Sequence, residues 1–198
     1  PQNPKTPDNY QSNKKEQYQM VELKSKPVVL ITGVSGYLGS HVANVFLKDG
    51  CYSVRGTVRD LSNAKKIEPL RKAFGHYFAD LTLVEADLLN ADSVINAIKG
   101  ADFVVHTASP FPLKQPRDEM ELIKPAVDGT LAVMKGCHLH KVKRVVITSS
   151  VAAISQCLPQ DRPQNNIYNE SHWSNPVGNH INAYSKSKTL AERAAWDF

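Results

Sequence analysis

A glycine-rich turn between an apolar run and a helical pattern constrains the fold of this chain most strongly. The sequence reads Val-Val-Leu-Ile-Thr-Gly-Val-Ser-Gly-Tyr-Leu-Gly over residues 28–39, which predicts a strand, a turn and the start of a helix. Gly33 permits the tight turn, Gly36 lets a pyrophosphate approach the backbone, and Gly39 lets the helix pack against the strand. The N–H groups at the helix start would face the phosphates. This predicts a dinucleotide site, with a ligand-free strand-to-helix turn as the alternative.

Further strands and helices alternate along the chain. Strands are predicted at 52–58, 81–85, 103–107 and 144–149, and helices at about 62–74, 92–98 and 118–138, with a last helix from near Asn182. Ser62 is expected to cap a helix that Pro69 could kink or end early, and the long helix must tolerate Pro125. The alternation predicts an α/β fold of the Rossmann type, a doubly wound parallel sheet covered on both faces.

The two ends of the chain differ from this pattern. Residues 1–26 are rich in Gln, Asn, Lys and Pro and lack apolar periodicity, which predicts a disordered tail before a dinucleotide-binding domain at 27–198. The final helical pattern reaches Phe198 without a cap or a glycine. We therefore expect the chain to be the N-terminal piece of a longer protein.

Charge and cysteine content exclude several classes of protein. The net charge of +5 is mild and scattered, which argues against nucleic-acid binding. No apolar run reaches the roughly 20 residues that span a bilayer, and no signal peptide is recognisable. The three cysteines are an odd, sparse set that suits a reducing compartment, so we expect a cytoplasmic protein. Cys137, His138 and His140 are poorly spaced for ligation, and we expect no metal site.

The residues after the second predicted strand indicate which cofactor the site takes. An NAD-binding domain usually places an acid about 20 residues past the glycine turn, whereas this chain has Arg59. A guanidinium suits a ribose 2′-phosphate, and Lys66 could reach the same group or be a solvated surface lysine. Asp60 leaves an alternative, because it could hold a ribose or cap a helix. The pattern favours NADP(H) over NAD(H).

A second group of residues could carry proton transfer. Tyr184 and Lys188 lie four residues apart, on one face of the last helix, whereas Lys186 points elsewhere. An ammonium beside a phenol lowers the pKa of the phenol, and a phenol that ionises near neutral pH can give its proton to a carbonyl as hydride arrives. Ser150 could bond the substrate oxygen, with Ser149 as the neighbour it could be confused with. A surface Tyr–Lys pair and capping serines are the alternatives.

These three elements, in this order, resemble the extended short-chain dehydrogenase/reductases, and among them the dihydroflavonol reductase and cinnamoyl-CoA reductase branch. The resemblance extends from residue 28 to residue 198. It rests on segments 29–39, 54–60, 86–88, 106–110, 124–130, 148–150 and 184–196. The run 125–130 favours this branch over the sugar epimerases.

The resemblance implies roles for individual residues. Ser150, Tyr184 and Lys188 would form the catalytic triad. Residues 170–173 look like the family's acid-to-tryptophan loop near the substrate side. The implied cofactor contacts come from the turn, the strand ends and the last helix: Gly33, Ser35, Gly36, Tyr37, Leu38, Gly39, Arg59, Lys66, Asp87, Leu88, Thr107, Ala108, Ser109, Thr148, Tyr184 and Lys188. Arg59 and Lys66 would hold the 2′-phosphate. Asp87 and Leu88 would lie at the adenine.

The same resemblance implies a function and a missing part. Family members continue for over a hundred residues with a substrate-binding domain, before which this chain is truncated. The leading hypothesis is an NADPH-dependent reductase of a small or flavonoid-like aldehyde or ketone, with Tyr184 as proton donor. One alternative is an NAD-linked sugar or steroid dehydrogenase-epimerase, but the presence of Arg59 argues against it. The other alternative is a non-catalytic NAD(P)-sensing module, but the presence of all three triad residues argues against it. The sequence predicts a small-molecule carbonyl partner and no particular oligomeric state.

Overall fold

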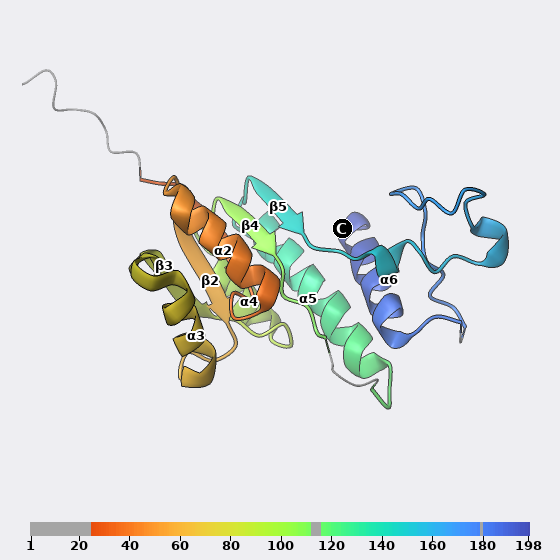
Figure 1. Ribbon diagram of the computed structural model, residues 1–198, viewed down its shortest axis with the longest axis horizontal. Coiled ribbons are helices and arrows are strands. Elements are labelled where there is room, and N and C mark those ends of the chain that lie inside the picture. The colour runs from red at the N-terminus through yellow and green to blue at the C-terminus, as the bar shows by residue number, and fades with distance from the viewer. Residues whose placement is uncertain (1–24, 112–115, 179) are drawn as a thin grey trace, which may run out of the picture.

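Five parallel strands form one sheet in the computed structural model, which describes residues 25–111, 116–178 and 180–198 (Figure 1). The strands are β1 (Val28–Thr32), β2 (Ser53–Val58), β3 (Leu81–Glu85), β4 (Phe103–His106) and β5 (Arg144–Ile147). Their order across the sheet is β3-β2-β1-β4-β5, and every neighbouring pair is parallel. The predicted α/β class is confirmed. Most of the predicted tail lies outside the described residues.

Helices cover both faces of the sheet. Buried side chains of α2 (Tyr37–Asp49) and α3 (Ala64–Phe74) pack on one face, and those of α4 (Ala91–Ile98) and α5 (Met120–Leu139) on the other. The last helix, α6 (Ala183–Trp196), lies beside α5 (Figure 1). Three short 3₁₀ helices follow α3 and β5: η2 (Gly75–Asp80), η3 (Val151–Ala153) and η4 (Pro159–Asp161). No described helix combines the length and the apolar character needed to cross a membrane.

The two layers explain why β1 has no alternating pattern. Val29 and Ile31 belong to the core under α2 and α3, while Leu30 belongs to the core under α4 and α5. Because β1 is buried on both sides, every position is apolar or small. The sequence predicted a sheet covered on both faces, which would bury β5 in the same way. That expectation was wrong, because β5 is an edge strand among the described residues and Val146 is 53% exposed.

Local hydrogen bonds correct one predicted helix start. Ser62 does not cap α3, because its backbone N–H and its hydroxyl both donate to Asp60 Oδ1, at 2.8 and 2.6 Å. Asn63 takes the cap position instead, and the helix begins at Ala64. Neither Pro69 in α3 nor Pro125 in α5 ends its helix. The last helix starts near Asn182 as expected, and Asn182 caps it by accepting a bond from the Ser185 N–H at 2.8 Å.

The strand order fixes where a ligand can bind. The chain adds β2 and β3 on one side of β1 and then returns to add β4 and β5 on the other side. The connections after β1 and β4 therefore leave the sheet in opposite directions, which opens a crevice beyond their carboxyl ends. The glycine-rich turn follows β1, and residues 107–109 follow β4. The two segments that the sequence singled out meet at this crevice.

Candidate active site

The glycine-rich turn is as tight as its residues predict. Gly33 adopts a φ of 70°, the left-handed region that favours glycine, and a Cβ on it would lie 3.0 Å from the Ala108 Cβ. A Cβ on Gly39 would overlap the Gly33 carbonyl oxygen and lie 2.9 Å from Thr107 Oγ1. The start of α2 therefore packs directly against the turn and against the segment after β4.

This packing leaves the N-terminus of α2 open. Gly36 is the N-cap residue and contributes no side-chain bond to the first free N–H groups. Gly36, Tyr37 and Leu38 are all exposed, whereas Gly39 below them is buried. Unpaired N–H groups and the positive end of the helix dipole bind phosphate groups. The residues present thus fit the pyrophosphate of a dinucleotide. Ser35, which the resemblance places with them, lies half-buried in the same turn.

The end of β2 presents two cations to solvent. Arg59 directly follows the strand and Lys66 lies in the first turn of α3. Both are exposed, and neither forms an ion pair within the described parts of the chain. Asp60 is engaged by Ser62, and these hydrogen bonds lower the pKa of its carboxyl group. Asp60, the acid that offered an alternative to a 2′-phosphate site, is therefore hydrogen-bonded within a local turn.

The end of β3 forms another compact turn. Asp87 Oδ1 accepts a hydrogen bond from the Leu89 N–H at 3.0 Å, and the Asp87 N–H donates to Ser93 Oγ at 3.0 Å. Leu88 packs against α5, where a Cβ on Gly129 would lie 2.9 Å from the Leu88 Cβ. Asp87 and Leu88 are both half-buried beyond the strand end, where the sequence predicted an adenine contact.

A hydrogen-bonded cluster joins the ends of β1 and β4. The Thr32 hydroxyl accepts from the N–H groups of Thr107 and Ala108, both at 3.0 Å, and lies 2.8 Å from His106 Nδ1. With two donors already on its oxygen, the Thr32 hydroxyl gives its proton to Nδ1, so the proton of His106 is on Nε2. Burial and the charge of Lys188 lower the pKa of His106 to about 4. The ring is therefore neutral at pH 7.

Helix α6 brings the predicted proton-transfer pair to this crevice. Lys188 Nζ donates to Ser109 Oγ at 2.7 Å, which ties α6 to the segment after β4, and it lies 5.8 Å from the centre of the Tyr184 ring. The Tyr184 ring meets Phe111 edge to face, with 5.3 Å between centres. Lys188 is buried, and burial lowers its pKa. Lys186 bonds Glu119 at 2.6 Å instead, so it does point elsewhere.

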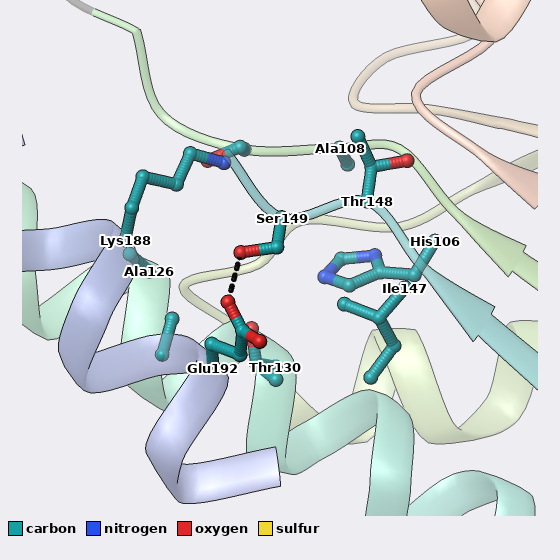
Figure 2. A pocket seen from close by; sticks show the side chains of 11 residues that line it. His106, Ala108, Ala126, Thr130, Ile147, Thr148, Ser149, Lys188 and Glu192 are labelled. Carbon is teal, nitrogen blue, oxygen red and sulfur yellow. Dashed lines mark hydrogen bonds between the residues drawn. The ribbon is translucent and has the colours of Figure 1, made fainter. Parts of the chain in front are cut away.

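The two serines after β5 have different partners. The Ser149 hydroxyl donates to the carboxylate of Glu192 on α6 (Figure 2). Ser150 starts η3, where its Oγ accepts a bond from the Ala152 N–H at 3.2 Å. Its own proton has no acceptor among the described residues. The hydroxyl proton of Ser150 is thus available to another acceptor, whereas the hydroxyl proton of Ser149 is bonded to Glu192. Thr148, before them, donates its N–H to the His106 carbonyl oxygen at 2.9 Å.

Two residues of this site had no predicted role. His106 and Glu192 line a small cavity together with Lys188, Ser149 and Thr130 (Figure 2). Glu192 follows Lys188 by four residues, the same spacing that singled out Tyr184 and Lys188, so the helix pattern could have indicated it. His106 ends an otherwise apolar strand, and nothing local distinguishes it from a core histidine.

The predicted acid-to-tryptophan loop packs farther along α6. Trp173 lies against Arg193, with the guanidinium carbon 5.0 Å from the ring centre. Arg193 is nine residues beyond Tyr184, so the described structure does not bring Trp173 beside the phenol. The loop contributes to a second hollow lined by Cys157, His172 and Arg193.

An open helix N-terminus at the switch point of a parallel sheet, beside a buried lysine and a tyrosine, defines a dinucleotide-binding α/β protein. Comparison with protein families agrees. Residues 29–198 match the model described as NAD dependent epimerase/dehydratase family, and the chain belongs to this family. The predicted family membership is confirmed.

Individual relatives are reductases. The chain is 40% identical over 182 residues to "Dihydroflavonol 4-reductase" of Arabidopsis thaliana, covering 89% of this chain and 46% of the relative. It is 38% identical over 175 residues to "Cinnamoyl-CoA reductase 1" of Petunia hybrida, covering 87% and 50%. Among solved structures it resembles yeast methylglyoxal/isovaleraldehyde reductase Gre2 complexed with NADPH, with a TM-score of 0.71, 30% identity and coverage of 86% and 52%. The chain thus spans about half the length of these proteins.

Proposed function

We propose that the complete protein is an NADPH-dependent reductase that transfers hydride to an aldehyde or ketone. The observation that carries the proposal is Lys188, which reaches from α6 to Ser109 at the β4 end while lying 5.8 Å from the Tyr184 ring centre. This joins a proton-donating pair to the crevice that fits a dinucleotide. The similarity to named reductases, one of them an NADPH complex, supports the same reaction.

The cofactor would be held by residues that follow the carboxyl ends of the five described strands. The open N-terminus of α2 would bind the pyrophosphate, and Arg59 and Lys66 would bind a 2′-phosphate through charge-assisted bonds. Asp87 and Leu88 would border the adenine, and residues 107–109 and Thr148 would border the rest. NADPH, when bound, supplies the hydride.

The chain's own residues would supply position and the proton. Tyr184 gives its phenolic proton to the carbonyl oxygen, and the nearby ammonium of Lys188 stabilises the phenolate that remains. Ser150 donates a hydrogen bond to the same oxygen and orients it, while keeping its own proton. Phe111 is 71% exposed and lies edge to face with Tyr184, which favours carbonyl substrates with an apolar or aromatic body. The free thiols of Cys51, Cys137 and Cys157 favour a reducing, cytoplasmic location.

Replacement of the proton donor tests the proposal. Tyr184→Phe keeps the ring and its contact with Phe111 and removes only the hydroxyl. In the complete protein, NADPH binding should survive while kcat falls by about 10²–10⁴-fold, the usual contribution of general acid catalysis. The measurement is loss of NADPH absorbance with a panel of aldehydes and ketones, alongside NADPH titration.

Tyr168→Phe is the matched control, because Tyr168 stacks with His172 in the loop before α6 rather than in the crevice. It should leave kcat unchanged. If Tyr184→Phe reduces a substrate as fast as the wild type in single-turnover hydride transfer, the catalytic assignment fails. The hypothesis of a non-catalytic cofactor-binding module would then be favoured.

A further inference from the structure

Among the described residues, no anion is in direct contact with the buried ammonium of Lys188. Lys188 is 9% exposed and its hydrogen-bond partner, the Ser109 hydroxyl, is neutral. Within the described parts of the chain Lys188 forms no ion pair. An ammonium surrounded by neutral groups tends to lose its proton, because burial disfavours the charged form. The proposed chemistry needs the charge, so the surroundings of Lys188 must supply compensation.

The groups that face Lys188 differ in the charge they can supply. From β4, His106 is neutral and directs an N–H, not a lone pair, from Nε2, because Nδ1 accepts the Thr32 proton. From α5, Ala126 and Thr130 line the cavity and carry no charge, and η3 contains only Val and Ala. Glu192 is the one carboxylate among the described residues that line this cavity.

Two hydrogen bonds hold the Glu192 carboxylate beside that cavity. Ser149 donates its hydroxyl proton to Oε2, and the Trp196 indole N–H lies 3.4 Å from Oε1. Both carboxylate oxygens therefore have a donor. Glu192 follows Lys188 by four residues, so both side chains project from the same face of α6, and Figure 2 draws them around one space. The cavity has a volume of about 20 Å³, enough for one water molecule between polar groups.

We propose that Glu192, fixed by Ser149, is the counter-charge of Lys188, a positioning residue that acts across the cavity and favours the charged form of the lysine. The inference rests on the proposed function, because the charge of Lys188 matters only if it serves Tyr184 and the cofactor. The proposal also gives Ser149 a role distinct from that of Ser150. Ser149 orients the carboxylate, whereas Ser150 faces the substrate oxygen.

A direct titration of Lys188 tests this proposal. In the complete protein with ¹³C-labelled lysine, the Lys188 signal is assigned by its loss in Lys188→Arg and is followed against pH. Glu192→Gln keeps the shape and an acceptor for Ser149 but removes the charge. The titration midpoint of Lys188 should fall by about one pH unit, the lower end of the range for a nearby opposite charge. Glu192→Asp, which restores the charge, should recover most of that shift.

Asp128→Asn is the matched control. Asp128 also follows a lysine, Lys124, by four residues, but this ion pair lies on the exposed side of α5. It should leave the Lys188 midpoint unmoved. Ser149→Ala provides a second route if Glu192→Gln fails to fold. It removes the donor that orients the carboxylate and should lower the midpoint by a smaller amount.

The titration separates this inference from the proposed function, since it needs no substrate. An unchanged midpoint in folded Glu192→Gln overturns the inference, whether or not the protein reduces carbonyls. A lowered midpoint in a protein that reduces none of the substrate panel upholds the counter-charge and overturns the proposed function.

Discussion

At the scale of single residues, Arg59 offers the clearest test of cofactor preference. Its exposed guanidinium stands at the β2 end without an ion pair in the described residues, so its charge is free for a 2′-phosphate. Arg59→Asp removes a charge-assisted bond of roughly 1.5–3 kcal/mol and adds repulsion. NADPH should therefore bind at least about tenfold more weakly, while NADH binding holds or improves. The measurement is the ratio of the two dissociation constants in the complete protein.

Arg144→Asp controls for the change in overall charge. Arg144 is exposed and begins β5, at the amino end of the sheet and away from the crevice. It should change both dissociation constants equally. Equal affinities of the wild type for NADPH and NADH, or an unchanged ratio in Arg59→Asp, would contradict the role given to Arg59.

The sequence predicted those candidate site residues whose positions follow from local geometry. Tyr184 and Lys188 share a face because a helix repeats every 3.6 residues, and Arg59 lies at the crevice because it follows a parallel strand. The role of His106 could not be predicted in this way. It depends on the Thr32 hydroxyl, 74 residues earlier, and on the approach of Lys188. Such roles follow from tertiary contacts rather than from spacing.

At the scale of elements, the contact between α2 and the turn before it decides whether the cofactor crevice forms. Gly39→Ala would push a methyl group into the Gly33 carbonyl oxygen and against Thr107. Overpacking of this kind costs about 1–3 kcal/mol. The displaced turn should also weaken NADPH binding at least about tenfold. Denaturant unfolding and NADPH titration measure the two effects.

Gly50→Ala is the matched control on the same helix. Gly50 ends α2 with a φ of 71°, but its Cβ would meet no atom within 4 Å. The substitution should cost about 1–2 kcal/mol of strain while NADPH affinity stays unchanged. Loss of stability without loss of NADPH binding in Gly39→Ala would refute the link between this helix start and the crevice.

The type of each helix and strand was predictable from the sequence, but the start of one helix and the burial of one strand were not. In the described parts of the chain, all five strands and all five α-helices match predicted segments, because their apolar periodicity is strong. The start of α3 was misplaced because Ser62 bonds Asp60, an equally local alternative to capping. The exposure of Val146 was missed because the apolar run is the same for a central strand and an edge strand.

At the scale of the whole molecule, the sheet order brings distant segments into one site. The β1 turn, residues 107–109 and α6 are separated by more than seventy residues from one to the next, and only the return of the chain across β1 unites them. The link between Lys188 and Ser109 spans 79 positions. Assembly of the crevice therefore requires the folded sheet, so stability and site chemistry should respond together to pH.

His106 makes that coupling measurable. Its pKa falls from 6.5 to about 4 on folding, because burial disfavours the charged ring and, to a smaller extent, because Lys188 repels it. In the unfolded chain His106 therefore binds a proton below pH 6.5, whereas in the folded chain it binds a proton only below about pH 4. Stability from the neutral ring is complete above pH 6.5 and should decline by about 3 kcal/mol as the pH falls to 4.

His106→Asn tests this decline, because the asparagine keeps a hydrogen-bond acceptor for Thr32 but does not titrate. The free energy of unfolding of the complete protein, measured by denaturant at several pH values, should fall more steeply between pH 6.5 and 4 in the wild type than in His106→Asn. His76→Asn, at an exposed position beside Tyr77, should retain the wild-type slope. Parallel curves for the wild type and His106→Asn would mean that the ring accepts its proton in the folded protein. The neutral Nε2–H form, and the place given to it beside Lys188, would then be wrong.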